Sequence, residues 1–154
     1  MAMTLSSEAF GEAEPIPTVH TCDGEDQSPP LSWSGAPEGT QSFALICDDP
    51  DAPGGTFAHW AVYDIPLEVD YLESGHSSPE RSGRYKEGTN DMGRACWGGP
   101  CPPEGHGTHH YQFRILALGT VGLKVPEGAK VPDVESAGRE HVLDEARLVG
   151  IYER

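Results

Sequence analysis

No stretch of this 154-residue sequence approaches the roughly 20 apolar residues that a membrane-spanning helix needs. The first residues, MAMTLSSEAFGEAEP, also lack the basic start and the apolar run of about 7 to 15 residues that mark a secretory signal. We therefore expect no membrane span and a location in the cytoplasm.

Basic residues are scarce as well. Ten Lys and Arg residues stand against 25 Asp and Glu residues, which gives a formal net charge of −15 at pH 7. The lysines are Lys86, Lys124 and Lys130. Because proteins bind nucleic-acid phosphates through clustered Lys and Arg side chains, we expect no nucleic-acid partner.

Cysteines are few and are not spaced like the ligands of a structural metal site. Four residues separate Cys96 from Cys101, and no second pair follows that would complete a zinc site. Cys22 and Cys47 stand alone in the sequence. Since nothing in the sequence indicates export, we predict that all four cysteines are reduced thiols.

Turn-forming residues are abundant, with 19 Gly and 14 Pro. This composition indicates short strands joined by turns, and the chain length suits one domain with one core over residues 1–154. The strand candidates are 42–49 (SFALICDD), 59–66 (HWAVYDIP) and 109–118 (HHYQFRILAL), with shorter ones at 16–21, 29–35 and 148–154.

Helices are nearly absent from the predicted elements. One is expected near the C-terminus, capped by Asp133 and continuing to about Leu148. Residues 74–95 are predicted to form a long loop. Because parallel strands need helical crossovers that this sequence lacks, we predict a mainly β fold of two sheets with one or two short helices.

Alternation within the strand candidates predicts which faces are buried. Segment 42–49 is apolar on both faces until its acidic end, so it is expected to be covered on both sides. In segment 59–66, alternation places His59 on the same face as Ala61 and Tyr63. In segment 109–118, His109 and Tyr111 share a face with the apolar residues that follow them.

Polar side chains stand where three of these strands meet proline-rich turns. Asp49 and Asp51 follow the first strand, His59 opens the second, and His109 and Tyr111 open the third. Prolines in the DPDAP and CPP turns fix φ and hold such groups in place before a ligand arrives. A carboxylate that orients an imidazole favours its protonated form, whose N–H can donate to an anion. We predict a preformed cavity for a phosphate or carboxylate group.

Two enzyme hypotheses compete with this binding protein, both acting on small phosphoesters. Histidines and aspartates also ligate transition metals, and a thiol at Cys101 beside His109 would form a reactive thiolate. No G-x-S-x-G motif indicates a serine hydrolase. We favour a non-enzymatic protein without cofactor or metal, and we expect His106 and His110 to be exposed and outside the site.

Four motifs carry a resemblance to a known family. The strings SPPLSW (28–33), DDPDAPGGTFAHW (48–60), NDMG (90–93) and GGPCPPEGHGTHHYQF (98–113) resemble the phosphatidylethanolamine-binding protein (PEBP) family, in its bacterial and archaeal Raf kinase inhibitor-like branch. The resemblance extends over nearly the whole chain. It implies a β-sandwich of two antiparallel sheets with a small cavity that binds phosphate-like anions.

The same resemblance assigns the residues of the cavity and suggests partners. The resemblance assigns Asp49, Asp51, His59, Pro103, His109 and Tyr111 to the cavity. To these ligand-binding residues we add Gly99, because a glycine lets the backbone amide approach a ligand, and Cys101 of the same loop. In this family, binding is associated with modulation of protein partners such as kinases or serine proteases, and prokaryotic members often form homodimers. We therefore expect a small anionic ligand, a protein partner and a homodimer.

Overall fold

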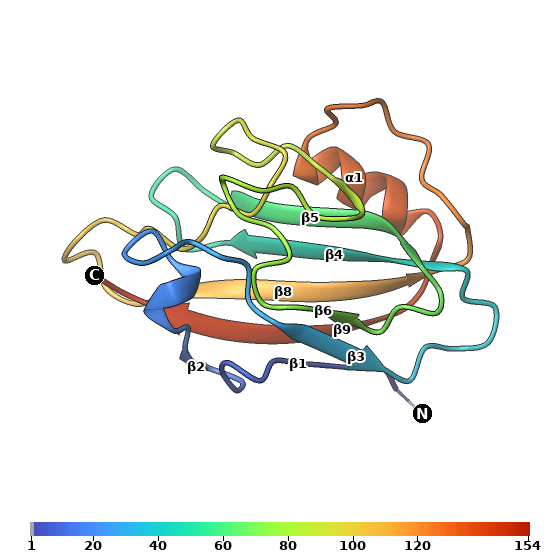
Figure 1. Ribbon diagram of the computed structural model, residues 1–154, viewed down its shortest axis with the longest axis horizontal. Helices are drawn as coiled ribbons and strands as arrows, with labels where there is room; N and C mark the ends of the chain where they lie inside the picture. Colours follow the sequence, from blue (N-terminus) through green and yellow to red (C-terminus); the bar gives the residue numbers. More distant parts are fainter. Residues whose placement is uncertain (1) are drawn as a thin grey trace.

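Two β-sheets face each other in the computed structural model, which describes residues 2–154 (Figure 1). The small sheet has the order β1-β3-β6, and the large sheet has the order β2-β9-β8-β4-β5-β7. The strands are β1 (Thr4–Ser6), β2 (Glu14–Pro15), β3 (Leu31–Ser34), β4 (Ser42–Asp49), β5 (Phe57–Pro66), β6 (Tyr71–Leu72), β7 (Lys86–Glu87), β8 (His109–Leu118) and β9 (Val142–Tyr152). One 3-10 helix, η1 (Thr18–His20), and one α-helix, α1 (Val131–Arg139), complete the described elements.

Neighbouring strands are antiparallel except β2 and β9, which run parallel. The prediction of a mainly β fold of two sheets is therefore confirmed, and the pairing is antiparallel apart from the two-residue strand β2. Within residues 2–154, no helix has the length and hydropathy of a membrane span.

Strand β4 lies at the centre of the fold and is buried along its whole length. Phe43 and Leu45 face the core between the two sheets, while Ala44 and Ile46 pack under α1 on the opposite side. The predicted bounds of this strand and its burial on both faces are confirmed. Segment 109–118 also forms a strand with the predicted bounds, and segment 59–66 lies within β5.

The C-terminal helix is shorter than predicted. It ends at Arg139, and residues 142–152 form β9 instead of continuing the helix to Leu148. Strand β9 pairs with β8 from Val142 to Tyr152, so long-range hydrogen bonding decides between strand and helix here. Asp133 lies in the first turn, and Lys130 is the N-cap residue.

Two other predicted segments differ in detail. Residues 16–21 form no strand, because Thr18–His20 makes a 3-10 turn after Pro17. The predicted loop 74–95 is mostly irregular, but Lys86 and Glu87 pair with Tyr63 and Val62 of β5. The prediction for 29–35 is confirmed by β3 within it.

The loop 74–95 is held to the core by the partly buried carboxylate of Glu87. Glu87 Oε1 accepts hydrogen bonds from Trp60 Nε1 at 2.6 Å and Ser77 Oγ at 2.7 Å, and Oε2 accepts one from the Gly83 amide at 2.6 Å. Since the carboxylate contacts both the strand β5 and the loop, it ties the loop to the large sheet.

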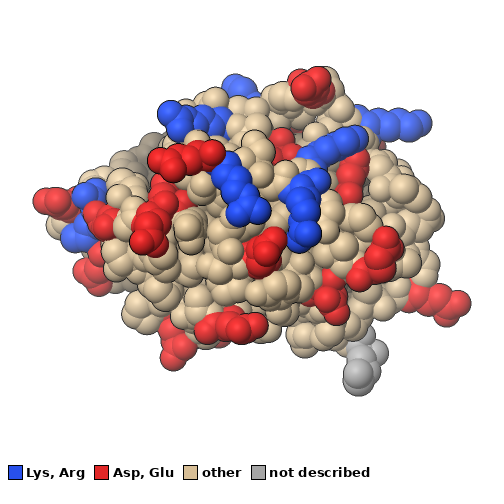
Figure 2. Space-filling view, viewed as in Figure 1, with Lys and Arg blue, Asp and Glu red and all other residues tan. Residues whose placement is uncertain are grey.

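Figure 2 shows acidic side chains spread over the face that includes the small sheet, with basic ones gathered toward its upper middle.

The loop 74–95 also contains His76, a buried histidine whose two ring nitrogens are not hydrogen-bonded to any described residue. Its ring is 1% exposed, stacks on Tyr85 with 5.5 Å between ring centroids, and has no hydrogen-bond partner for either nitrogen within residues 2–154. Burial lowers the pKa of His76, and the nearby charges of Arg84 and Arg81 lower it further, while Glu73 acts in the opposite direction. The folded protein therefore holds this histidine neutral.

We predict that the free energy of unfolding falls as the pH drops below the ordinary histidine pKa of 6.5. The unfolded chain binds a proton there that the folded chain rejects, so stability is complete above that pH and decreases below it. Urea unfolding at about pH 7.5 and about pH 5 measures the effect. His76→Phe, which keeps the stacking on Tyr85, should flatten the dependence; an unchanged slope would contradict this assignment.

Candidate functional site

A cavity of about 220 Å³ opens at the end of the large sheet where β4 stops and β5 and β8 begin. This is the left end of the molecule in Figure 1, where loops from three parts of the chain meet. The lining residues are Asp49, Ala52, Pro53, Phe57, His59, Met92, Cys101, Pro102, Pro103, His109 and Tyr111. Most of this lining is apolar, and no Lys or Arg belongs to it.

Asp49 and His109 form a buried pair across β4 and β8. The Nδ1 of His109 donates to Asp49 Oδ2 at 2.6 Å, and the two side chains are 2% and 4% exposed. The other ring nitrogen, Nε2, lies 2.6 Å from Nδ1 of His106. A chain of three side chains thus runs from a buried carboxylate to the exposed His106. His106 is exposed as predicted, but it contacts a lining residue.

His59 reaches the cavity because of a β-bulge. Cys47 of β4 pairs with Trp60 and the next residue, Asp48, pairs with Ala58, so His59 is an extra residue in β5. Such a bulge redirects a side chain, and the His59 ring lies edge-on to Tyr111, with 5.2 Å between ring centroids. The predicted alternation is wrong here. Ala61 and Tyr63 pack on the other face of the sheet, in the cluster under α1.

The backbone fixes the orientation of the His59 ring. Its Nδ1 donates to the carbonyl oxygen of Gly98 at 2.5 Å. Burial lowers the pKa of His59, and this outweighs the raising effects of the Gly98 carbonyl and of Asp49. The Asp49 carboxylate favours the protonated ring of His59, as expected, but burial has the larger effect and favours the neutral ring. Burial also raises the pKa of the Tyr111 hydroxyl, with Asp49 adding to the effect.

Two predicted site residues lie outside the cavity. Asp51 is exposed and accepts hydrogen bonds from the amide and the Nδ1 of His110, at 2.9 and 2.7 Å. Gly99 donates its amide hydrogen to Asp26 Oδ1 at 2.8 Å, and a Cβ at this position would lie 2.3 Å from that oxygen and from the His20 carbonyl oxygen. Gly99 is thus required for close packing of two loops.

The other predicted residues are brought together in the cavity wall: Asp49, His59, Cys101, Pro103, His109 and Tyr111. Sequence reasoning missed the apolar lining residues Ala52, Phe57 and Met92, and it identified Pro53 and Pro102 only as prolines that stiffen the turns. All of these lie within or beside the turn motifs DPDAPGGTF, NDMG and CPP, so the motifs themselves were the available signal. Within residues 2–154, no group of three His, Cys, Asp or Glu side chains is arranged to hold a metal ion.

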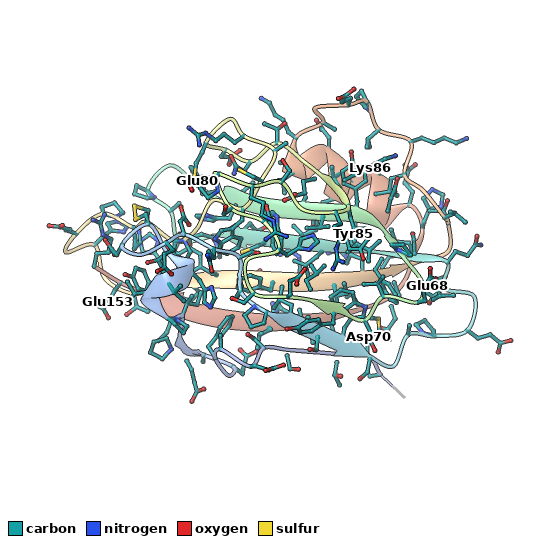
Figure 3. The ribbon with its side chains drawn as sticks, viewed as in Figure 1. Glu68, Asp70, Glu80, Tyr85, Lys86 and Glu153 are labelled. Atoms are coloured by element: carbon teal, nitrogen blue, oxygen red, sulfur yellow. A yellow bond between two sulfur atoms is a disulfide. The ribbon has the colours of Figure 1, made fainter. Side chains whose placement is uncertain are left out.

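Cys101 is joined to Cys22 by a disulfide, with 5.4 Å between the Cα atoms (the yellow bond at the left in Figure 3). The prediction of four reduced thiols is therefore wrong for this pair, while Cys47 and Cys96 are free and buried. The two residues are 79 positions apart in the sequence, and only the contact between their loops makes the pairing evident. With its sulfur bonded, Cys101 cannot act as the thiolate of a cysteine-dependent enzyme.

The C-terminal residues hold the same loop from the other side. The amide of Gly105 donates to the Arg154 carbonyl oxygen at 3.0 Å, and Arg154 Nη1 donates to the Pro102 carbonyl oxygen at 3.4 Å. Arg154 also pairs with Asp23, next to the disulfide, at 3.3 Å. The CPP wall of the cavity is thus fixed by a covalent bond and by these polar contacts.

A model of the phosphatidylethanolamine-binding protein family matches residues 6–153. The chain therefore belongs to this family, as its motifs predicted. It is 50% identical over 153 residues to a UPF0098 protein of Aquifex aeolicus, covering 99% of this chain and 89% of that protein. It is 35% identical to the solved structure of Escherichia coli YbcL, a member of the mammalian PEBP family, with a TM-score of 0.92 and 100% and 99% of the two chains covered.

A more distant solved structure shares the fold alone. It is a carboxypeptidase Y inhibitor complexed with its cognate proteinase, 18% identical, with a TM-score of 0.52 over 98% of this chain and 82% of that one.

We predict that reduction of the Cys22–Cys101 bond lowers the free energy of unfolding by about 2–5 kcal/mol, because the bond closes a long loop in the unfolded chain. Urea unfolding with and without dithiothreitol measures this difference. The Cys22→Ser/Cys101→Ser double variant should have the reduced stability under both conditions, and a response of this variant to reductant would point to Cys47 or Cys96 instead.

Proposed function

We propose that this protein is a binding module whose cavity takes the phosphate or carboxylate group of a small anionic ligand. The observation that carries the proposal is the convergence of Asp49, His59, His109 and Tyr111 on one preformed cavity with braced apolar walls. Membership of the PEBP family supports it. The hydrogen bonds that hold both imidazole rings are made without a ligand, so little ordering is needed on binding.

The size of the cavity limits what enters it. At about 220 Å³ it is smaller than the roughly 300–1,000 Å³ of pockets that enclose a drug-sized ligand. A head group fits, and the rest of a larger ligand would lie at the mouth, on the loops around the cavity. This arrangement suits an anionic group presented by a larger molecule.

A protein partner is the second part of the proposal. The distant fold relative inhibits a proteinase to which it is bound, and we propose that this chain likewise modulates a protein, such as a kinase or serine protease, as a homodimer. The occupied cavity would be part of the contact surface. No nucleic acid is expected in this role, given the net charge of −15.

Titration with inorganic phosphate, followed by NMR of the histidine rings, tests the anion site. We expect the ring signals of His59 and His109 to move, while those of the exposed His141, in the turn between α1 and β9, stay in place. Unmoved His59 and His109 signals at saturating phosphate would count against the site.

A conservative variant makes the test quantitative. Tyr111→Phe removes a hydroxyl that can donate to the anion and should weaken phosphate binding about tenfold, the effect of losing a hydrogen bond to a charged group. Tyr85→Phe, at the stacked residue labelled in Figure 3, is the matched control and should bind phosphate like the unmodified protein. Equal affinities of the two variants would remove Tyr111 from the site.

A further inference from the structure

An oxyanion needs hydrogen-bond donors, and the side chains around this cavity offer few. No Lys or Arg lines it, and its ionisable residues are Asp49, His59, His109 and Tyr111. A carboxylate can only accept. The Tyr111 hydroxyl belongs to the lining and can donate. Whether the anion finds further side-chain donors therefore depends on the two imidazole rings.

The backbone decides which nitrogen of His59 carries hydrogen. A carbonyl oxygen only accepts, so the 2.5 Å contact with Gly98 requires the hydrogen to be on Nδ1. The Nε2 of a neutral ring then carries a lone pair. Because the ring is 4% exposed and burial lowers its pKa, His59 meets the cavity as an acceptor.

The same reasoning applies to His109. Its Nδ1 donates to the Asp49 carboxylate, so a neutral ring has a lone pair on Nε2. That lone pair accepts the hydrogen on Nδ1 of His106, 2.6 Å away. His106 in turn is left with a lone pair on its own Nε2. With all three rings neutral, no ring N–H is left over to donate to a ligand.

Charge adds a second obstacle to a bare anion. The Asp49 carboxylate lies in the cavity wall, and Asp48 and Asp91 act on His59 from β4 and from the loop 74–95. Two further groups raise the pKa of Tyr111 through their charges: Asp51, in the turn after β4, and Tyr152 on β9. These surroundings favour one added positive charge when an anion enters.

We propose that the cavity binds its anion together with one proton taken from solvent, which the His106–His109 pair holds. The inference rests on the proposed anion-binding function. The proton enters on His106, which is exposed. After uptake His109 carries hydrogen on both ring nitrogens, and His106 keeps its hydrogen on Nε2. When the ligand replaces His106 as the partner of His109, the contact with His106 Nδ1 is given up and His109 Nε2–H donates to the ligand oxygen. Asp49 stabilises the resulting imidazolium.

The pair is a better proton site than His59. His109 is hydrogen-bonded to a carboxylate, whereas the Nδ1 of His59 is bonded to a neutral carbonyl. His106 also gives the pair direct access to solvent. The ligand class that follows is a singly charged oxyanion, because one proton and one negative charge leave the net charge of the site unchanged.

Phenyl sulfate is the probe, because a sulfate ester keeps one negative charge and carries no proton near neutral pH, so any proton must go to the protein. We expect its affinity to fall about tenfold per pH unit as the pH rises from about 7 to about 9. Calorimetry in two buffers of different protonation enthalpy should show uptake of close to one proton at about pH 8. Nitrogen shifts should report an imidazolium in the His106–His109 pair while His59 stays neutral.

His110→Ala is the matched control, because His110 is exposed and pairs with Asp51 outside the cavity; its proton uptake should equal that of the unmodified protein. Binding without proton uptake, with an affinity independent of pH, would overturn the inference and leave anion binding intact. So would binding of inorganic phosphate without binding of phenyl sulfate at about pH 6, because the proton would then arrive on the ligand. If neither anion binds at any pH, the proposed function falls, and this inference with it.

Discussion

Antiparallel pairing of β4 with β5 and β8 is the constraint on which the site depends. Because neighbouring strands run in opposite directions, the end of β4 lies beside the beginnings of the other two. Asp49 therefore meets His109 although 60 residues separate them in the sequence. The cavity lies where β4 ends, where β5 and β8 begin, and where the turns attached to these strands diverge.

Much of this arrangement could be predicted from the sequence. Strand β4 is marked by an apolar run that continues to its acidic end, and β8 by apolar residues that alternate with polar ones before a final apolar run; proline-rich motifs mark the turns at the site end of both strands. Polar residues at such ends are conspicuous, so Asp49, His59, His109 and Tyr111 could be selected without coordinates. The family motifs added Pro103 to the same wall, where Cys101 of the same loop also lies.

The rest could not be predicted, because it depends on contacts between distant segments. The bulge at His59 is a matter of register between two strands, and a regular alternation of side chains cannot reveal an extra residue. Strand β9 contains residues that also suit a helix, and its pairing with β8 settles the choice. Asp51 fits the motif, yet its carboxylate binds His110 at the surface.

The cytoplasmic location stays a prediction, and disulfides are rare in the cytosol of mesophiles.

The bond between Cys22 and Cys101 also changes the covalent connectivity of the molecule. It encloses β3 to β7, the turn 50–56 and the loop 74–95 in one ring, whereas β8, α1 and β9 lie on the tail that follows. A protease that cuts once at the exposed turn 50–56, or within 74–95, opens this ring without separating two fragments. The nicked protein stays a single covalent species, with its cavity wall still attached, until a reductant divides it.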